Sequence, residues 1–260
     1  MAHTSSVSLY DYPRYYDAVF GTTSDVEAAF LLECFELYAI RKVKRVFEPA
    51  TGSGRLLVEL ARAGMTVSGC DLSPAAAAYG NARLRRYGFP RAIEVFDMAD
   101  FRLKPKVDAA FNLISSFQHL PSDAAAESHL RSMASSLVRG GLYIVGVQLL
   151  PSRGRRSGSE AWSGRQGKVH VQTDLKTVRL DREKRVDVCR MISTIKDGKK
   201  TLRIQENLRF RTYTRTQFLG LLGRVPELTI AATYDFNYTI HAPVPVDARS
   251  QDAIFVLRRT

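Results

Sequence analysis

One glycine-containing turn constrains the fold of this chain more than any other feature. Residues 44–54 read Lys-Arg-Val-Phe-Glu-Pro-Ala-Thr-Gly-Ser-Gly, and leucines at helical spacing come directly after them. The order of apolar strand, glycine turn and helix is typical of a parallel strand whose carboxyl end faces a ligand. Gly52 and Gly54 permit a turn and a close approach that a Cβ would block. This stretch therefore predicts a βα unit of an α/β protein, with a cofactor at the turn.

The spacing of the turn distinguishes between two kinds of cofactor site. A dinucleotide fingerprint, Gly-x-Gly-x-x-Gly, would need a third glycine at the position of Leu57. The chain instead reads acidic-x-Ala-x-Gly-x-Gly, with Glu48, Ala50, Gly52 and Gly54 in the named positions. This spacing resembles motif I of the class I S-adenosylmethionine-dependent methyltransferases. Gly-Ser-Gly alone is equally compatible with a plain tight turn, so the interpretation depends on the next strands of the chain.

Two carboxylates stand at the ends of the next two expected strands. The resemblance implies that Asp71 accepts hydrogen bonds from a ribose and that Leu72 packs on the adenine. It also implies that Asp97 receives the adenine amino group, while the backbone of Met98 meets the ring. Asp97 is preferred to Asp100 because it stands directly at the strand end. The alternative for Asp71 is a cap for the helix that begins at Ser73-Pro74.

The remaining pattern predicts the architecture. Apolar runs alternate with helical patterns, which indicates βαβ units and a parallel sheet. The fifth run comes after Gly140-Gly141, which we interpret as the end of the preceding helix. The resemblance implies a Rossmann-like, seven-stranded methyltransferase sheet whose last two strands are antiparallel. The seven runs lie near residues 46–47, 65–71, 92–96, 107–114, 142–147, 228–235 and 253–258.

The excess of positive over negative charge is confined to one segment of the chain. The 260 residues carry a net charge of +12, and residues 151–224 hold 19 Lys/Arg against 7 Asp/Glu. Three β-branched runs, at 169–180, 186–195 and 201–210, come after a stretch rich in glycine, serine and arginine. We expect an antiparallel β lobe of about three strands inserted in the α/β fold. The predicted division is 1–150, a SAM-binding core with an N-terminal helical lid; 151–213, the basic lobe; and 214–260, completion of the sheet.

The basic lobe has three interpretations. Arg209 and Arg211, which alternate along one strand face, would clamp an anionic small substrate. The charges could equally form a solvated surface. Nucleic acid, RNA included, ranks third, because Asn112-Leu-Ile-Ser does not match the Asn/Asp-Pro-Pro-aromatic quartet of base-amino methyltransferases. Aromatic residues for base stacking are also sparse in the lobe.

Within the family, the chain is most similar to N-methyltransferases of nucleotide-linked amino sugars. Tyr15-Tyr16-Asp17 and the stretch from Ser115 to Leu120 carry this resemblance. It implies that Tyr16 or Tyr15 closes over the methionine end of the cofactor, that Ser115 lies on the cofactor side and that His119 faces the substrate. The alternatives are a histidine that merely packs at a helix start and tyrosines that only anchor an N-terminal helix.

The implied chemistry is an in-line attack of a substrate N or O on the sulfonium methyl group. The electrophile is already activated, so the protein mainly aligns the reactants. His119 is suited to accept a proton, since the pKa of an unperturbed histidine is ~6.5. Tyr234 lies at a strand end near the expected pocket mouth and is a substrate-contact candidate. A catalytically silent SAM-binding protein is an alternative function.

The composition limits the kinds of site and the cellular setting that we expect for this chain. Three cysteines, Cys34, Cys70 and Cys189, suit neither a disulfide framework nor a zinc quartet, and no metal is expected. We found no leader pattern and no run of apolar residues as long as a membrane span. The expectation is a cytoplasmic enzyme without a membrane partner, a monomer or a homodimer, acting on a small molecule.

Overall fold

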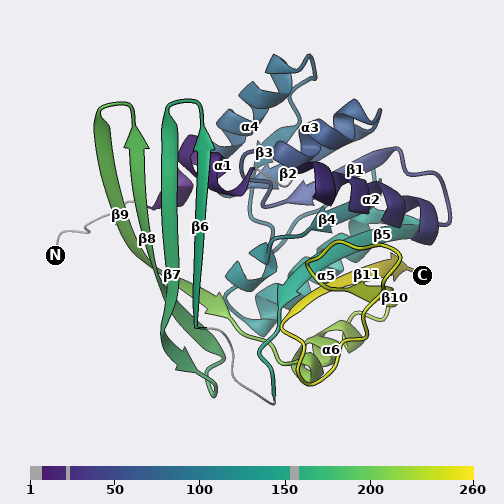
Figure 1. The fold of residues 1–260 in the computed structure, drawn as a ribbon. Coiled ribbons are helices and arrows are strands. Elements are labelled where there is room, and N and C mark those ends of the chain that lie inside the picture. Colours follow the sequence, from purple (N-terminus) through teal and green to yellow (C-terminus); the bar gives the residue numbers. More distant parts are fainter. Residues whose placement is uncertain (1–7, 22–23, 153–157) are drawn as a thin grey trace.

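A computed structural model describes residues 8–21, 24–152 and 158–260 and contains two β-sheets (Figure 1). The larger sheet has the strand order β10-β11-β5-β4-β1-β2-β3. Strand β11 is antiparallel to both β10 and β5, while β1 to β5 pair in parallel. The predicted fold class, a seven-stranded Rossmann-like methyltransferase sheet with a smaller antiparallel sheet, is confirmed. Its strands are β1 Arg45–Pro49, β2 Thr66–Asp71, β3 Ile93–Val95, β4 Val107–Asn112, β5 Leu137–Gln148, β10 Leu228–Tyr234 and β11 Asp252–Arg259.

Helices cover both faces of this sheet and create two hydrophobic clusters. One face packs on α2 Ser24–Tyr38, α3 Arg55–Arg62 and α4 Pro74–Arg86, and the other on α5 Asp123–Ser136 and α6 Arg215–Gly223. Successive side chains of β11 point to opposite faces of the sheet. Ile254 and Val256 join the first cluster, whereas Phe255 and Leu257 join the second. A strand buried on both faces in this way explains its aliphatic sequence.

The start of β5 differs from the prediction. We expected Gly140 and Gly141 to end a helix, but both lie inside the strand, which begins at Leu137. Gly140 has a φ of 78°, and a Cβ on Gly141 would stand 2.7 Å from the carbonyl oxygen of Asp108. The glycines therefore permit a local irregularity in the pairing of β4 with β5, and they do not end a helix.

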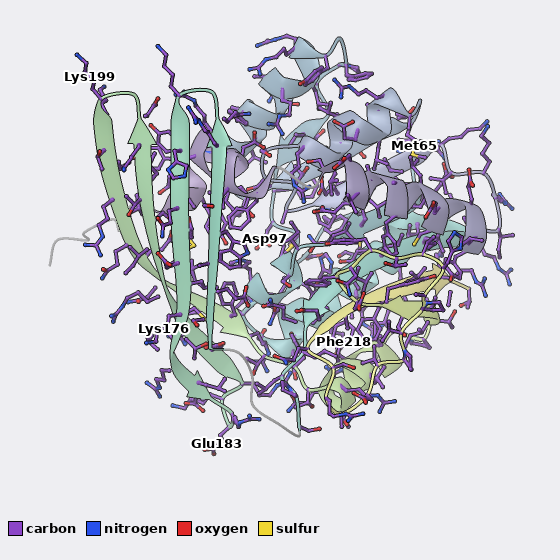
Figure 2. All side chains as sticks on the ribbon, viewed as in Figure 1. Met65, Asp97, Lys176, Glu183, Lys199 and Phe218 are labelled. Carbon is purple, nitrogen blue, oxygen red and sulfur yellow. The ribbon has the colours of Figure 1, made fainter. Side chains whose placement is uncertain are left out.

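The smaller sheet, here called the lobe, has four antiparallel strands in the order β6-β7-β8-β9. They are β6 Ser159–Gln166, β7 Val169–Asp181, β8 Val186–Asp197 and β9 Lys200–Arg211. The sequence predicted the last three but not β6, whose residues Ser-Glu-Ala-Trp-Ser-Gly-Arg-Gln include no β-branched side chain. Lys199 and Glu183 mark opposite ends of the lobe (Figure 2). The division at residues 150 and 213 stays a prediction.

The N-terminal segment packs on the lobe. A short 3₁₀ helix, η1 Leu9–Asp11, and helix α1 Pro13–Phe20 share a third hydrophobic cluster with the inner face of the lobe (Figure 1). At Gly164 of β6, an added Cβ would stand 1.7 Å from the carbonyl oxygen of Ala18, so the helix backbone rests directly on the strand. The pair of helices η1 and α1 is called the lid.

Candidate functional site

A cavity of about 770 Å³ lies where the lid faces the carboxyl ends of the parallel strands. Open α/β sheets bind ligands at this edge. The cavity floor comes from the segments after β1, β2, β3 and β4, and η1 and α1 contribute the opposite wall. Figure 2 shows Asp97 between the two sheets, at the level of this cavity. Residues from four strand ends and the N-terminus therefore converge on one space.

The turn after β1 has the geometry that its glycines predict. Gly52 has a φ of 56°, lines the cavity and has open space where a Cβ would stand. Gly54, with a φ of 66°, caps α3 behind the cavity wall, and a Cβ there would come within 3.0 Å of Ile93 and 3.3 Å of Gly80. Gly52 thus leaves room for a ligand, while Gly54 permits close packing of the turn on α4.

Asp71 connects the end of β2 to this turn. Its Oδ2 accepts a hydrogen bond from the backbone N–H of Gly52 at 2.8 Å, and its Oδ1 accepts one from Ser73 at 2.9 Å. Ser73 itself caps α4 by accepting from Ala76. Burial raises the pKa of Asp71. Because each carboxylate oxygen has a second lone pair, the side chain retains acceptor capacity on the cavity side.

Glu48 lies in the cavity floor, and the pKa of its carboxyl is strongly raised. It is 8% exposed and accepts a hydrogen bond of 2.5 Å from the hydroxyl of Thr51. Burial raises its pKa to about 8. Asp11, Asp71 and Asp97 line the same cavity. Among the described lining residues, Arg55 is the sole Lys or Arg, and it pairs with Glu27 at 2.5 Å. The cavity of this basic chain is therefore rich in carboxyl groups.

His119 lines the same cavity and stands among aromatic rings. It ends the 3₁₀ helix η2 Ser116–His119, which comes after β4. Its Nε2 lies 3.4 Å from the hydroxyl of Tyr10, and its ring packs edge-on against Phe210 of β9 at 5.0 Å between centroids. Tyr10 in turn contacts Tyr16 at 5.5 Å. Desolvation lowers the pKa of His119, so the ring is neutral at pH 7 and able to accept a proton.

Comparison with known proteins agrees with this geometry. Residues 46–141, which carry the turn and both strand-end aspartates, match the family described as "Methyltransferase domain". The chain contains a methyltransferase domain. The match confirms the predicted resemblance and the enzyme class, and the methyl donor of this family is S-adenosyl-L-methionine. A search of curated proteins found no significant match.

Solved structures share the fold of the whole chain around this domain. DesVI from Streptomyces venezuelae is 18% identical, with a TM-score of 0.77 over 98% of this chain and 100% of that chain. The sugar N-methyltransferase KedS8 from Streptoalloteichus is 18% identical, with a TM-score of 0.74 over 100% of this chain and 95% of that chain. CalS10 from Micromonospora echinaspora, an amino pentose methyltransferase, is 19% identical, with a TM-score of 0.74 and full coverage of both chains. At these identities the likeness establishes the fold.

Most of the predicted cofactor residues line the cavity of the methyltransferase domain. They are Glu48, Ala50, Gly52, Asp71, Leu72, Asp97 and Met98, together with Tyr16 and His119 from the predicted catalytic pair. Tyr10 and Asp11 line it as well, although no sequence pattern distinguished them from surface residues. They stand three and two residues before Pro13, the first residue of α1. This position, close to the start of a predicted lid helix, is the sequence signal that could have indicated them. The individual roles stay predictions.

Besides Gly54, which stands behind the cavity wall, two predicted cofactor residues lie beside the cavity rather than in it. Tyr15 lies on the side of α1 that faces the lobe, where its hydroxyl donates to Asp197 at 3.3 Å. Adjacent residues of a helix point about 100° apart, and since Tyr16 lines the cavity, Tyr15 does not. Ser115 has a φ of 48°, its Oγ is buried without a hydrogen-bond partner among the described residues, and its neighbour Ser116 lines the cavity.

The three predicted substrate residues also lie elsewhere in this arrangement. Arg209 is exposed on the outer face of the lobe. Arg211 pairs with Asp123 of α5 at 2.9 Å. Tyr234 is buried, and its hydroxyl lies 2.5 Å from that of Tyr38. An arginine clamp that faces the cavity is therefore not formed by these side chains.

Metal-binding clusters and membrane spans are both missing from the described residues. Those residues contain no group of three or more His, Cys, Asp or Glu side chains arranged to hold a metal ion. They also contain no helix with the length and apolar character needed to cross a membrane. Within the same part of the chain, Cys34, Cys70 and Cys189 are buried, and no disulfide joins them.

Proposed function

We propose that this protein transfers a methyl group from S-adenosyl-L-methionine to an amine nitrogen of a small molecule. The observation that carries the proposal is the cavity itself. It brings a glycine turn, strand-end carboxylates and a neutral histidine together around one space. Its volume of about 770 Å³ suits a nucleoside-sized cofactor together with a small substrate.

The residues at the turn fit the cofactor. Gly52 leaves space beside the backbone, and Asp71 has acceptor capacity for vicinal ribose hydroxyls. Asp97, Met98 and Leu72 would bracket the adenine. When bound, S-adenosylmethionine supplies an activated methyl electrophile. The protein's contribution is to hold and orient the two reactants and to exclude water from them.

An amine is the nucleophile that the cavity favours. Asp11 at the lid and the neutral His119 both line the cavity, and a carboxylate attracts an ammonium group. The imidazole can accept the proton that the amine sheds before or during attack. An oxygen nucleophile would gain little from the lining carboxylates. The expectation of an anionic substrate has support from the charge of residues 151–224, but the cavity lining itself favours a cation.

Calorimetric titration tests the cofactor assignment. We expect micromolar binding of S-adenosylmethionine and S-adenosylhomocysteine, loss of that binding in Asp71→Ala, and weaker binding of NAD. Preference for NAD would overturn the assignment. Formation of S-adenosylhomocysteine with a panel of primary and secondary amines, but not with the matching alcohols, would then separate an N-methyltransferase from an O-methyltransferase. No turnover with any nucleophile would favour a SAM-binding protein without chemistry.

A further inference from the structure

Asp17 joins four parts of the molecule, although the resemblance carried by Tyr15-Tyr16-Asp17 assigned it no role. Its side chain is 4% exposed, in the middle of the lid helix α1. Oδ1 accepts a hydrogen bond of 2.8 Å from the hydroxyl of Ser53, in the turn between Gly52 and Gly54. Oδ2 accepts from the guanidinium of Arg83 on α4, with which it forms an ion pair, and from Gln166 of β6 at 3.3 Å.

We propose that Asp17 is a positioning residue that ties closure of the lid to occupancy of the cofactor turn. The inference rests on the proposed function, because it assigns the turn to the cofactor. A buried carboxylate is retained only where its charge is paired and hydrogen-bonded. Asp17 obtains its partners from the turn, α4 and the lobe together, so the lid must sit in this place for the charge to be satisfied.

The position of Asp17 in the helix makes the coupling local to the site. Tyr16, the residue before Asp17, lines the cavity. Ser53, the hydrogen-bond partner of Asp17, lines it too. A ligand that fixes the turn therefore fixes the donor side of the Asp17 contact. Through that contact it also fixes the helix that carries Tyr16 and, four residues before Asp17, Pro13 of the cavity wall.

The rest of the lid is attached to the lobe. Leu9 donates its N–H to Glu206 at 2.9 Å, Arg14 pairs with Asp197 at 3.0 Å, and the apolar side of α1 lies in the lobe cluster. The lid and lobe consequently share one core, and Asp17 is a polar contact from that unit to the turn and α4. Coupling of this kind is reciprocal: a ligand that stabilises the closed lid is bound more tightly when the contact is present.

Hydrogen exchange with S-adenosylhomocysteine tests the coupling. In the wild type, the ligand should slow exchange of the amides of residues 9–20. In Asp17→Ala, we expect about a tenfold weaker Kd for the ligand, since the hydrogen bond from Ser53 to a charged group is lost. The slowing at residues 9–20 should also be lost, even at saturating ligand. Ser53→Ala removes the same contact from the turn side and should give the same two effects.

Two further variants sharpen the test. The double variant Asp17→Ala/Ser53→Ala should bind no more weakly than the weaker single variant, because both changes break the contact between Asp17 and Ser53. Asp197→Asn, which loosens the lid from the lobe but not from the turn, should keep the ligand-dependent slowing. Retention of that slowing in both single variants would overturn the inference alone. Failure of the wild type to bind the ligand would instead overturn the proposed function and, with it, this inference.

Discussion

Replacement of Glu48 by glutamine should change how the stability of the protein depends on pH. Glu48 is 8% exposed, lies in the cavity floor and accepts a hydrogen bond from Thr51. Desolvation is the largest influence on its pKa and raises it from 4.5 to about 8, although the Thr51 hydrogen bond and Arg55 act in the opposite direction. Glutamine has the same shape and keeps an acceptor for Thr51, but it cannot ionise.

Proton linkage gives the sign of the effect. Between pH 4.5 and about 8 the folded protein holds a proton on Glu48 that the unfolded chain has released. The folded state binds more protons in this window, so the free energy of unfolding falls as pH rises. At 1.36 kcal/mol for each tenfold change, the full window corresponds to ~5 kcal/mol, and ~3.4 kcal/mol of that is expressed by pH 7.

Urea unfolding at pH 5 to 9 measures this difference. The free energy of unfolding of the wild type should fall with pH more steeply than that of Glu48→Gln, by ~3–5 kcal/mol across the range. Other titrating groups affect both proteins equally, so the difference between the two curves reports Glu48. Parallel curves would show that Glu48 titrates normally and that the cavity floor is better solvated than its burial indicates.

Three further perturbations test the lid, the base and the lobe junction. Gly164→Ala should lower the free energy of unfolding by ~3 kcal/mol, because its Cβ would stand 1.7 Å from the carbonyl oxygen of Ala18. Gly158→Ala, with nothing within 4 Å, is the matched control, and equal stability of the two variants would contradict the packing. His119→Ala should reduce kcat far more than cofactor affinity. The wild-type pH–rate profile should lose activity on its acid side below pH 6.5, the ordinary pKa of histidine, because burial lowers the pKa of this ring; an acid limb unchanged in the variant would remove it as the base. Asp123→Ala, which leaves two paired arginines without their carboxylate, should cost ~1–2 kcal/mol in urea unfolding, and no loss would mean that the pairs are fully screened.

The sequence predicted which residues of the turn and the strand ends line the cavity, because the signals are local. Gly52, Asp71 and Asp97 each stand at a strand end, and the carboxyl ends of parallel strands meet at one edge of a sheet. The alternation of Ile254 and Phe255 likewise needed no tertiary information. In such segments the periodicity of side chains fixes which face each one occupies.

The contacts of the lid and the lobe were not predictable in the same way, since they join distant parts of the chain. Arg211 looked available because strand parity places it beside Arg209, yet it pairs with Asp123, 88 residues away. Asp17 meets Ser53 and Gln166 across 36 and 149 residues. No spacing rule links such positions, and a strand without β-branched residues, such as β6, gives no signal of its own.

The sharing of one hydrophobic core by the lid and the lobe affects the order in which the polypeptide can fold. Leu9 finds its hydrogen-bond acceptor on Glu206, 197 residues later, so the lid completes its contacts with the lobe only after β9 has been synthesised. Contacts over such sequence separations form late, after the loop entropy between them has been overcome. The parallel strands from β1 to β5 can associate earlier, since they lie between these two positions. The cavity therefore gains its complete lid wall only after the lobe has formed, and a chain cut short within the lobe would leave part of the apolar side of α1 uncovered.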